Sequence, residues 1–224
     1  MMDNENSLFM REILPFWNKI DAAQQRVLEE SVVHKTFAQG ESLHSGDEDC
    51  SGLFVIKKGR IRVFILSEAG KEITLYRLFE RDICIFSASC MIRNINFEVF
   101  VTAETDTEAL LIPTFVFEQL SKTALAVADY TNQLMASRFS DVMWVMEQVL
   151  FMSFDKRLAV FLLEQANIEG TDTLEITQET IAKHMGSARE VVTRMLKYFN
   201  DEGIVELFRG GLKIADRKKL ISLT

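Results

Sequence analysis

The chain of 224 residues is short of cysteine, of proline and of long apolar runs. Its three cysteines are an odd number without a disulfide framework, so we expect the protein in a reducing cytoplasm. No apolar run approaches the roughly 20 residues of a membrane-spanning helix, and the N-terminal segment MMDNENSLFM lacks the basic and apolar parts of a secretion signal. With 48% hydrophobic and 26% charged residues, the composition indicates a folded protein without a membrane partner.

The sequence also lacks the signatures of catalysis. It contains no recognisable pairing of a nucleophile with a base, no glycine-rich phosphate loop and no metal-ligand spacing around its three histidines. We therefore expect neither an enzyme nor a metal site.

The charge of the chain is unevenly distributed. The formal net charge is −8, yet residues 177–224 hold nine Lys and Arg against six Asp and Glu. The remaining residues hold 16 basic and 27 acidic side chains. This asymmetry indicates that only the C-terminal segment meets an anionic partner, although ordinary variation between domains would also produce it.

The ten glycines fall into two groups, one between positions 40 and 70 and one from position 170 onward. The first group separates short β-rich runs that are typical of an antiparallel roll or barrel. The predicted strands lie in 53–66 (two strands around a Lys-Gly turn), 67–78 (a turn and a third strand), 98–103 and 108–112. Pro113 then ends the last strand and suits the first position of a helix.

A long helix is predicted next, because the chain has neither glycine nor proline from 114 to 169. Positions spaced alternately by three and four residues form a heptad seam, in which one buried Asn would fix the register of two paired helices. The predicted dimer seam is Leu125, Ala128, Asn132, Met135, Phe139, Val142, Met146 and Val149. A helix that packs only on its own domain is the alternative, but Val127, Leu134 and Val145 supply a second apolar face, so one helix could do both.

The C-terminal segment predicts two short helices and a hairpin, after a helix over 154–166. Thr177 caps the first short helix, Gly186 forms a turn, and Ser187 begins a second helix that runs to about Asp201. Residues 204–216 then predict a hairpin closed by Arg209 and the two glycines that follow it. Two helices joined by a tight turn and followed by a hairpin are typical of a winged helix-turn-helix.

The second helix of this pair carries the candidate base-reading residues Arg189, Glu190, Thr193 and Arg194. At about 100° per residue, these side chains share one face, opposite the apolar positions. Arginine can donate two hydrogen bonds to guanine, and glutamate can accept one from cytosine. Ser187 and Glu190 also fit a capping box, and both arginines could be ordinary solvated side chains.

Contacts with DNA phosphates are expected from polar and basic side chains around this helix and on the hairpin. These candidates are Thr177, Ser187, Lys197, Arg209 and Lys213.

The segment ITQETIAKHMGSAREVVTRMLKYFNDEGIVE closely resembles the winged helix-turn-helix of the cyclic-AMP receptor / fumarate-nitrate regulator (CRP/FNR) superfamily of bacterial transcription factors. The segments FAQGESLHSGDEDCSGLFVIKKGRIRVF and GKEITLYRLFERD resemble the β-roll of the same superfamily. The resemblance implies an α+β protein with an N-terminal antiparallel β-roll similar to cyclic-nucleotide-binding jelly rolls (1–115), a long dimerisation helix (116–152) and a C-terminal winged helix-turn-helix (153–224). It further implies a homodimer on a palindromic operator in double-stranded DNA, with RNA polymerase as a partner.

Two departures from the family pattern argue against cyclic AMP as the effector. Cyclic-nucleotide binders of this family carry a Gly-Glu pair for the ribose, and this chain has Ile85 and Phe86 there. They also carry an Arg-Ser pair for the cyclic phosphate, and this chain has Phe97 and Glu98 near that place. A phosphate needs a cation or free N–H donors, and a carboxylate beside it would repel it.

The candidate effector or redox residues are Cys84, Phe86, Cys90 and Phe97. The iron-sulfur members of the family use four cysteines, three of them near the N-terminus, whereas this chain has none before Cys50. A haem-based member has a cysteine near the place of Cys84, but its axial histidine is replaced here by Phe86, so we expect neither cofactor. A thiol switch between Cys84 and Cys90 requires Cα atoms within about 7 Å. Cysteines buried as small apolar residues are the simpler alternative.

The sequence therefore predicts a DNA-binding transcription regulator with a small-molecule or redox effector that is not identified. The alternative is a ligand- or redox-sensing module whose C-terminal domain binds a protein instead of DNA. DNA binding through Lys and Arg weakens steeply as the salt concentration rises, and this dependence distinguishes the two.

Overall fold

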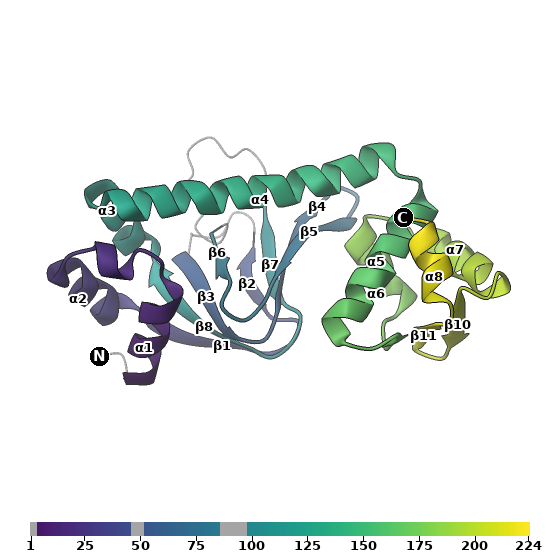
Figure 1. The fold of residues 1–224 in the computed structure, drawn as a ribbon, viewed down its shortest axis with the longest axis horizontal. Coiled ribbons are helices and arrows are strands. Elements are labelled where there is room, and N and C mark those ends of the chain that lie inside the picture. Colours follow the sequence, from purple (N-terminus) through teal and green to yellow (C-terminus); the bar gives the residue numbers. More distant parts are fainter. Residues whose placement is uncertain (1–3, 46–51, 86–97) are drawn as a thin grey trace. The chain divides into compact units, whose positions relative to one another are not determined.

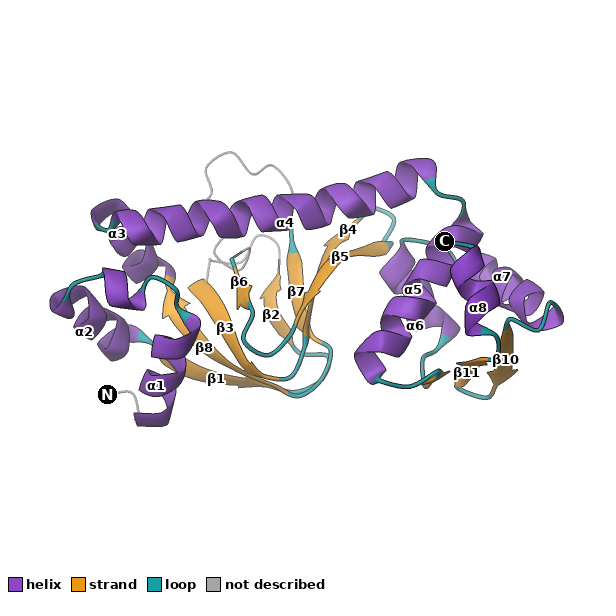
Figure 2. Ribbon diagram, in the orientation of Figure 1, coloured by secondary structure: helices purple, strands orange, loops and turns teal. Residues whose placement is uncertain are grey.

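The computed structural model describes residues 4–45, 52–85 and 98–224, which form two compact units. Unit 1 comprises Met1–Ile65 and Leu75–Val142, and unit 2 comprises Leu66–Thr74 and Met143–Thr224. Antiparallel sheets dominate the first and helices the second, which confirms the α+β class (Figure 2). The predicted division into 1–115, 116–152 and 153–224 stays a prediction.

The β-roll of unit 1 consists of two four-stranded antiparallel sheets (Figure 1). The buried faces of both sheets meet in one apolar core, as alternating strand patterns require. One sheet has the order β1 (Val33–Phe37), β8 (Thr107–Pro113), β3 (Gly52–Lys58), β6 (Ile83–Cys84), and the other has β2 (Ser42–Ser45), β7 (Phe100–Ala103), β4 (Ile61–Leu66), β5 (Glu72–Leu78). The predicted roll is confirmed.

The Lys-Gly turn between β3 and β4 is present as predicted, but the two strands do not pair with each other. β3 pairs with β8 and β6, whereas β4 belongs to the other sheet and pairs with β7. Gly59 has a φ of +93°, and a Cβ atom there would lie 2.4 Å from the carbonyl oxygen of Asp106. The crossing between sheets therefore requires glycine at this position.

An ion-pair triad in the roll links Arg77 on β5 with Arg60, just before β4, and Glu104, just after β7. Glu104 pairs with Arg60 at 2.7 Å and with Arg77 at 2.9 Å, and all three side chains are at most 18% exposed. Since removing one partner from a buried triad leaves charges without compensation, the carboxylate of Glu104 stabilises both guanidinium groups.

We expect Glu104→Gln to lower the free energy of unfolding by about 3 kcal/mol, because two largely buried cations would lose the carboxylate that pairs with both of them. Urea unfolding followed by circular dichroism measures this change. Glu68→Gln, at an exposed position, is the matched control and should change the unfolding free energy by less than about 0.5 kcal/mol. Equal unfolding free energies for both variants would contradict the stabilising role of the triad.

An N-terminal helical arm, which the sequence analysis did not predict, packs on the roll (Figure 1). It consists of α1 (Asn4–Ile13), the 3-10 helix η1 (Trp17–Lys19) and α2 (Ala22–Ser31). Asp21 begins α2 with a capping box, in which its side chain accepts from the backbone N–H of Gln24 at 2.8 Å. Met10 and Phe16 are buried in the core of unit 1, so tertiary packing stabilises these short helices.

The predicted continuous helix over 116–152 is two helices. Pro113 is the N-cap of α3 (Thr114–Thr123) and not its first helical residue, and α4 (Leu125–Phe151) follows after Ala124. Ala124 has φ −125° and ψ 110°, an extended conformation that ends α3. No glycine or proline marks this break, and it lets both helices pack on the same core, through Phe117 of α3 and Val127 of α4.

Helix α4 has one face against the roll and one exposed apolar stripe. Val127 and Leu134 are buried in unit 1. Five exposed apolar residues lie within about 60° of one another around the helix at ~100° per residue. We call them the α4 stripe: Leu125, Phe139, Met143, Met146 and Leu150.

The α4 stripe refines the predicted dimer seam. Leu125, Phe139, Met146 and Val149 are exposed, as is Asn132, but Met135 and Val142 are half-buried against the core of unit 1. Ala128 is also half-buried. Met143 and Leu150 were not in the predicted seam, and both are exposed. Each directly follows a predicted seam residue, Val142 and Val149 respectively. The seam itself stays a prediction.

Unit 2 is a helical domain with a three-stranded sheet (Figure 1). Its core is formed by apolar side chains from four helices and three strands, including Leu162, Ile181 and Leu196. The elements are α5 (Phe154–Glu169), β9 (Thr173–Leu174), α6 (Gln178–Met185), α7 (Arg189–Asp201), β10 (Val205–Phe208), β11 (Gly211–Ile214) and α8 (Arg217–Ser222), with strand order β10-β11-β9. The winged helix-turn-helix is confirmed, while β9 and α8 were not predicted.

Candidate nucleic-acid interface

Helix α6 begins and ends where the sequence predicts. Thr177 is the N-cap, and its hydroxyl accepts a hydrogen bond from the backbone N–H of Thr180 at 3.0 Å. Gly186 ends the helix with a φ of +63°, in the left-handed region that favours glycine. These two local signals set the tight turn that places α6 beside α7.

We expect Thr177→Ala to lower the free energy of unfolding of unit 2 by about 1 kcal/mol, because the N-cap hydrogen bond is lost. Thr177→Ser keeps the hydroxyl and serves as the control. Chemical denaturation of both variants measures the difference, and an unchanged stability of the alanine variant would show that the cap contributes little.

Helix α7 begins two residues later than predicted, at Arg189. Its N-cap is Ala188, whose methyl group cannot accept a hydrogen bond, so the alternative of a capping box between Ser187 and Glu190 is not formed. Ser187 instead lies in the turn before the helix, where it is half-buried. Glu190 is exposed in the first turn of α7, where the positive end of the helix dipole stabilises its carboxylate.

One face of α7 is buried and the other carries the predicted base-reading residues. Val192, Leu196 and Phe199 lie in the core of unit 2. Arg189, Glu190, Thr193, Arg194 and Lys197 are all exposed. Within the described part of the chain, Arg189, Glu190 and Arg194 enter no ion pair, so their charged groups are available to a ligand.

The hydroxyl of Thr193 is already engaged within the fold. Its Oγ1 lies 2.5 Å from Oε1 of Gln178 and 2.9 Å from the carbonyl oxygen of Arg189. Gln178, the first residue of α6, was not among the predicted site residues, and it links the two helices at the surface. Thr193 therefore positions the helix pair and offers a base mainly its methyl group.

Arg157 on α5 is a second residue that the sequence analysis missed. Its guanidinium donates to the carbonyl oxygen of Met185 at 2.6 Å, at the C-terminal end of α6 where carbonyl groups lack helical partners. Burial lowers the pKa of this guanidinium from its usual value. Arg157 therefore anchors the turn between α6 and α7, and no pattern in the local sequence indicates that contact.

The wing is formed by β10 and β11 with Arg209 and Gly210 in the turn. Arg209 and Lys213 are exposed, in agreement with a phosphate-binding role. Gly211 allows β11 to approach β9 closely, since a Cβ atom there would lie 2.2 Å from the carbonyl oxygen of Leu174. The structure thus places Thr177, Lys197 and the two wing cations on the surface of unit 2.

The candidate effector residues are only partly described. Cys84 is buried on β6, and Ile85 beside it is also buried. Tyr76 on β5 is buried as well, and its burial, with the nearby thiol of Cys84, raises its pKa well above the usual value. Phe86, Cys90 and Phe97 lie outside the described residues, so the predicted thiol pair stays a prediction.

In residues 4–45, 52–85 and 98–224, no three side chains of His, Cys, Asp or Glu come together as a metal site would require. None of the helices described there has the length and apolar character to span a bilayer.

Two family models match the chain and together cover both units. The model described as "Cyclic nucleotide-binding domain" matches residues 34–124, and the model described as "Crp-like helix-turn-helix domain" matches residues 156–223. The first covers most of the roll together with α3, and the second covers α6, α7 and the wing.

Known proteins resemble the chain over most of its length. A crystal structure of a Eubacterium rectale protein, assigned to transcriptional regulators of the crp/fnr family, has a TM-score of 0.92 at 50% identity and covers 95% of this chain and 98% of that one. The cAMP-activated global transcriptional regulator CRP of Pasteurella multocida is 24% identical over 193 residues, 83% of this chain and 91% of its own length. The c-di-GMP responsive regulator CLP of Xanthomonas campestris shares the fold, with a TM-score of 0.73 at 16% identity over 88% of this chain and all of that one.

Proposed function

The chain belongs to the CRP/FNR family of transcriptional regulators, and we propose that it acts as a homodimer that reads a two-fold symmetric DNA operator. The observation that carries this proposal is the exposed face of α7. Two arginines and a glutamate project there from a rigid helix whose opposite face is buried. An effector other than cyclic AMP would control the binding.

Each half-site would be read by Arg189, Glu190 and Arg194 of one subunit. An exposed guanidinium can grip O6 and N7 of guanine with two hydrogen bonds, and the carboxylate of Glu190 can accept from N4 of cytosine. Glu190 is free for this contact because it does not cap its own helix. Thr193 lies beside them and contributes its methyl group.

Phosphate contacts would hold the helix in register on the duplex. Lys197, Arg209 and Lys213 are exposed cations near the reading face, while Thr177 and Ser187 offer neutral donors. Residues 177–224 carry a net positive charge, whereas the rest of the chain is acidic and repels the DNA backbone, which favours approach through this segment.

We expect operator affinity to fall about 10³-fold between 50 and 200 mM salt, because a dimer with three phosphate-binding cations per subunit releases about six counterions. Lys197→Gln should reduce the magnitude of the log–log salt slope by about two, one for each subunit. Fluorescence anisotropy with a labelled operator measures both slopes. A slope that Lys197→Gln leaves unchanged would remove this residue from the phosphate contacts.

Pairing of two α4 helices would create the dimer. The α4 stripe leaves a row of large apolar side chains in water, including Phe139 at 66% exposure. Asn132 lies in line with this row, where an Asn pair fixes helix register. The two α7 helices must then lie about 34 Å apart to enter successive major grooves, so a shift of the paired helices would switch DNA binding.

The residues at the expected nucleotide site favour an effector other than cyclic AMP. Ile85 stands where a ribose-binding pair is expected, and its side chain is buried. Glu98 lies near the expected phosphate position, where its carboxylate would repel an anion. We infer that the relatives' response to cyclic AMP does not extend to this chain.

The proposal is tested by selecting operators from a random DNA pool and measuring their affinity. A palindromic consensus with two half-sites about one helical turn apart is the expected result. Equal affinity for the selected and for scrambled DNA would overturn the proposed function. Added cyclic AMP should leave the operator affinity unchanged, and activation by it would overturn the proposed effector class.

A further inference from the structure

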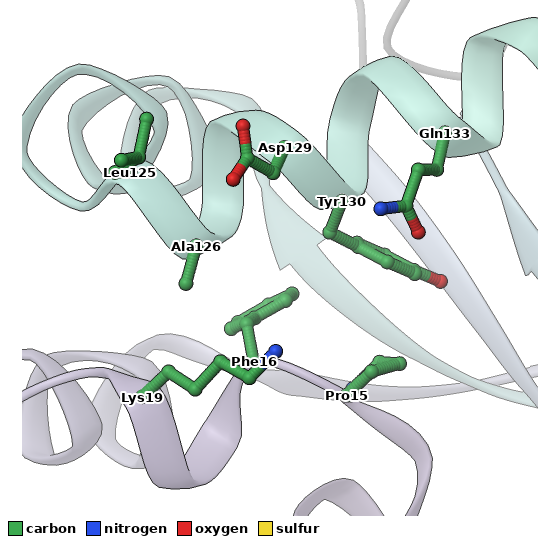
Figure 3. Close-up of a pocket in the computed structure, with 8 residues that line it drawn as sticks. All are labelled: Pro15, Phe16, Lys19, Leu125, Ala126, Asp129, Tyr130 and Gln133. Atoms are coloured by element: carbon green, nitrogen blue, oxygen red, sulfur yellow. The ribbon is translucent and has the colours of Figure 1, made fainter.

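A groove lies within unit 1 between the N-terminal arm and the beginning of α4. Its volume is about 420 Å³, within the range of small-molecule sites. Residues from η1 and the loop before it form one wall, and the first three turns of α4 form the other (Figure 3). We call it the arm groove, lined by Pro15, Phe16, Lys19, Leu125, Ala126, Asp129, Tyr130 and Gln133.

The groove has an aromatic floor that the core holds in place. Phe16 is only 1% exposed, and its ring lies 5.5 Å from the ring of Tyr130 and 6.5 Å from that of Phe117. Ala126 and Pro15 add apolar surface beside these rings (Figure 3). Phe16 therefore supports the groove from beneath, and the accessible apolar surface comes from exposed Pro15 and half-buried Ala126 and Tyr130, which a ligand would not have to order first.

Polar groups of opposite charge line the same groove. Lys19 belongs to η1, whereas Asp129 and Gln133 belong to α4. Among the described residues, none of these three side chains has a hydrogen-bond or ion-pair partner. Further along α4, Arg138 and Asp141 pair with each other at 2.7 Å, whereas Lys19 and Asp129 are exposed and available to a ligand.

We propose that the arm groove binds a small zwitterion, namely a free α-amino acid with an apolar side chain. The ammonium group of Lys19 would bind the carboxylate of the ligand, and the carboxylate of Asp129 would bind its ammonium group. Gln133 can donate to or accept from either end. The apolar side chain would pack on Pro15, Ala126 and Tyr130.

The charge balance of the groove selects against other ligand classes. A nucleotide or other polyanion would find one cation, Lys19, and would be repelled by Asp129. A purely apolar compound would desolvate both charged groups without replacing their water hydrogen bonds. A zwitterion supplies one partner for each.

Occupancy of the groove would tie the arm to the beginning of α4. Leu125 lines the groove and is also the first residue of the α4 stripe, so a bound ligand would restrain the end of the helix that pairs with a second subunit. This regulatory consequence depends on the proposed function. The binding itself does not, because it is measured without DNA.

The test is isothermal titration calorimetry of the full-length protein with L-leucine and L-phenylalanine. Saturable binding of at least one of them is expected. Lys19→Gln and Asp129→Asn should each weaken it about tenfold or more, since a charge-assisted hydrogen bond is lost. Lys35→Gln and Glu30→Gln, exposed in unit 1 outside the groove, are the matched controls and should bind as the wild type does.

Modified ligands and a filled groove complete the test. N-acetyl-leucine lacks the ammonium group and leucine methyl ester lacks the carboxylate, so each should bind at least tenfold more weakly than leucine. Gln133→Trp, at an exposed position of the groove wall, should fill the groove and abolish binding while the thermal unfolding midpoint stays near that of the wild type. Absence of binding by both amino acids, equal binding of the acetylated form, or unchanged binding in both charge variants would overturn the proposal. None of these results bears on operator recognition.

Discussion

Replacing Arg194 by alanine is expected to lower the affinity for the operator by about 2–6 kcal/mol, or roughly 30-fold to 10⁴-fold. The estimate follows from a bidentate guanine contact of about 1–3 kcal/mol, lost once in each half-site of a symmetric dimer. Arg194 is exposed on α7, and its side chain has no ion-pair partner in the described part of the chain. Affinity for scrambled DNA should fall much less, since a base contact carries the sequence preference.

Lys218→Ala is the matched control for this loss of one positive charge. Lys218 is exposed on α8 of the same unit but lies outside the predicted reading face. Anisotropy titrations with operator and scrambled DNA should show that Arg194→Ala loses specificity, whereas Lys218→Ala changes both affinities alike. If the two variants behave identically, Arg194 does not read bases.

The helix-turn-helix could be predicted from sequence because its boundaries depend on local chemistry. Thr177 needs only its own hydroxyl and the N–H three residues later to cap α6, and Gly186 needs only its own freedom to adopt a positive φ. The face of α7 that is exposed follows from helical periodicity alone. Contacts that join distant segments were missed, such as that of Arg157 with Met185, because no local pattern encodes them.

The N-terminal arm and the break at Ala124 show where sequence reasoning reaches its limit. The capping box of Asp21 and Gln24 was a readable signal for α2, but the arm is held by burial of Phe16 and Met10 against distant strands. Ala124 carries no breaker signal at all. The assignment of β3 and β4 to different sheets is likewise decided by long-range pairing.

The apolar pattern of α4 could not reveal which residues face their own roll and which face solvent. Ala128, Met135 and Val142 occupy equivalent heptad positions and are half-buried, the last two against the core of unit 1. Met143 and Leu150, one position further along the heptad, are exposed instead. Apolar residues at intervals of three and four predict an apolar helix face for the half-buried set and for the exposed set alike. Only the three-dimensional packing shows which set contacts the roll of the same chain and which is left for a partner helix.

The α4 stripe leads to a second large effect, on the oligomeric state. Phe139→Glu is expected to raise the dimer dissociation constant by about 10²-fold to 10⁴-fold, because two rings worth about 1.5–3 kcal/mol each would no longer be buried. Two carboxylates facing each other across the symmetry axis would add repulsion. Sedimentation equilibrium measures the constant directly.

Ser137→Glu is the matched control for this charge, since Ser137 is exposed on about the opposite side of α4 from Phe139. It should remain dimeric and keep its operator affinity, while Phe139→Glu should lose cooperative binding to the palindrome and retain weak binding to a single half-site. This split follows because one α7 per monomer still reads its bases, whereas the second helix is no longer delivered to the adjacent groove. A monomeric Phe139→Glu that still binds the full palindrome as tightly as the wild type would show that α4 pairing does not set the spacing of the recognition helices.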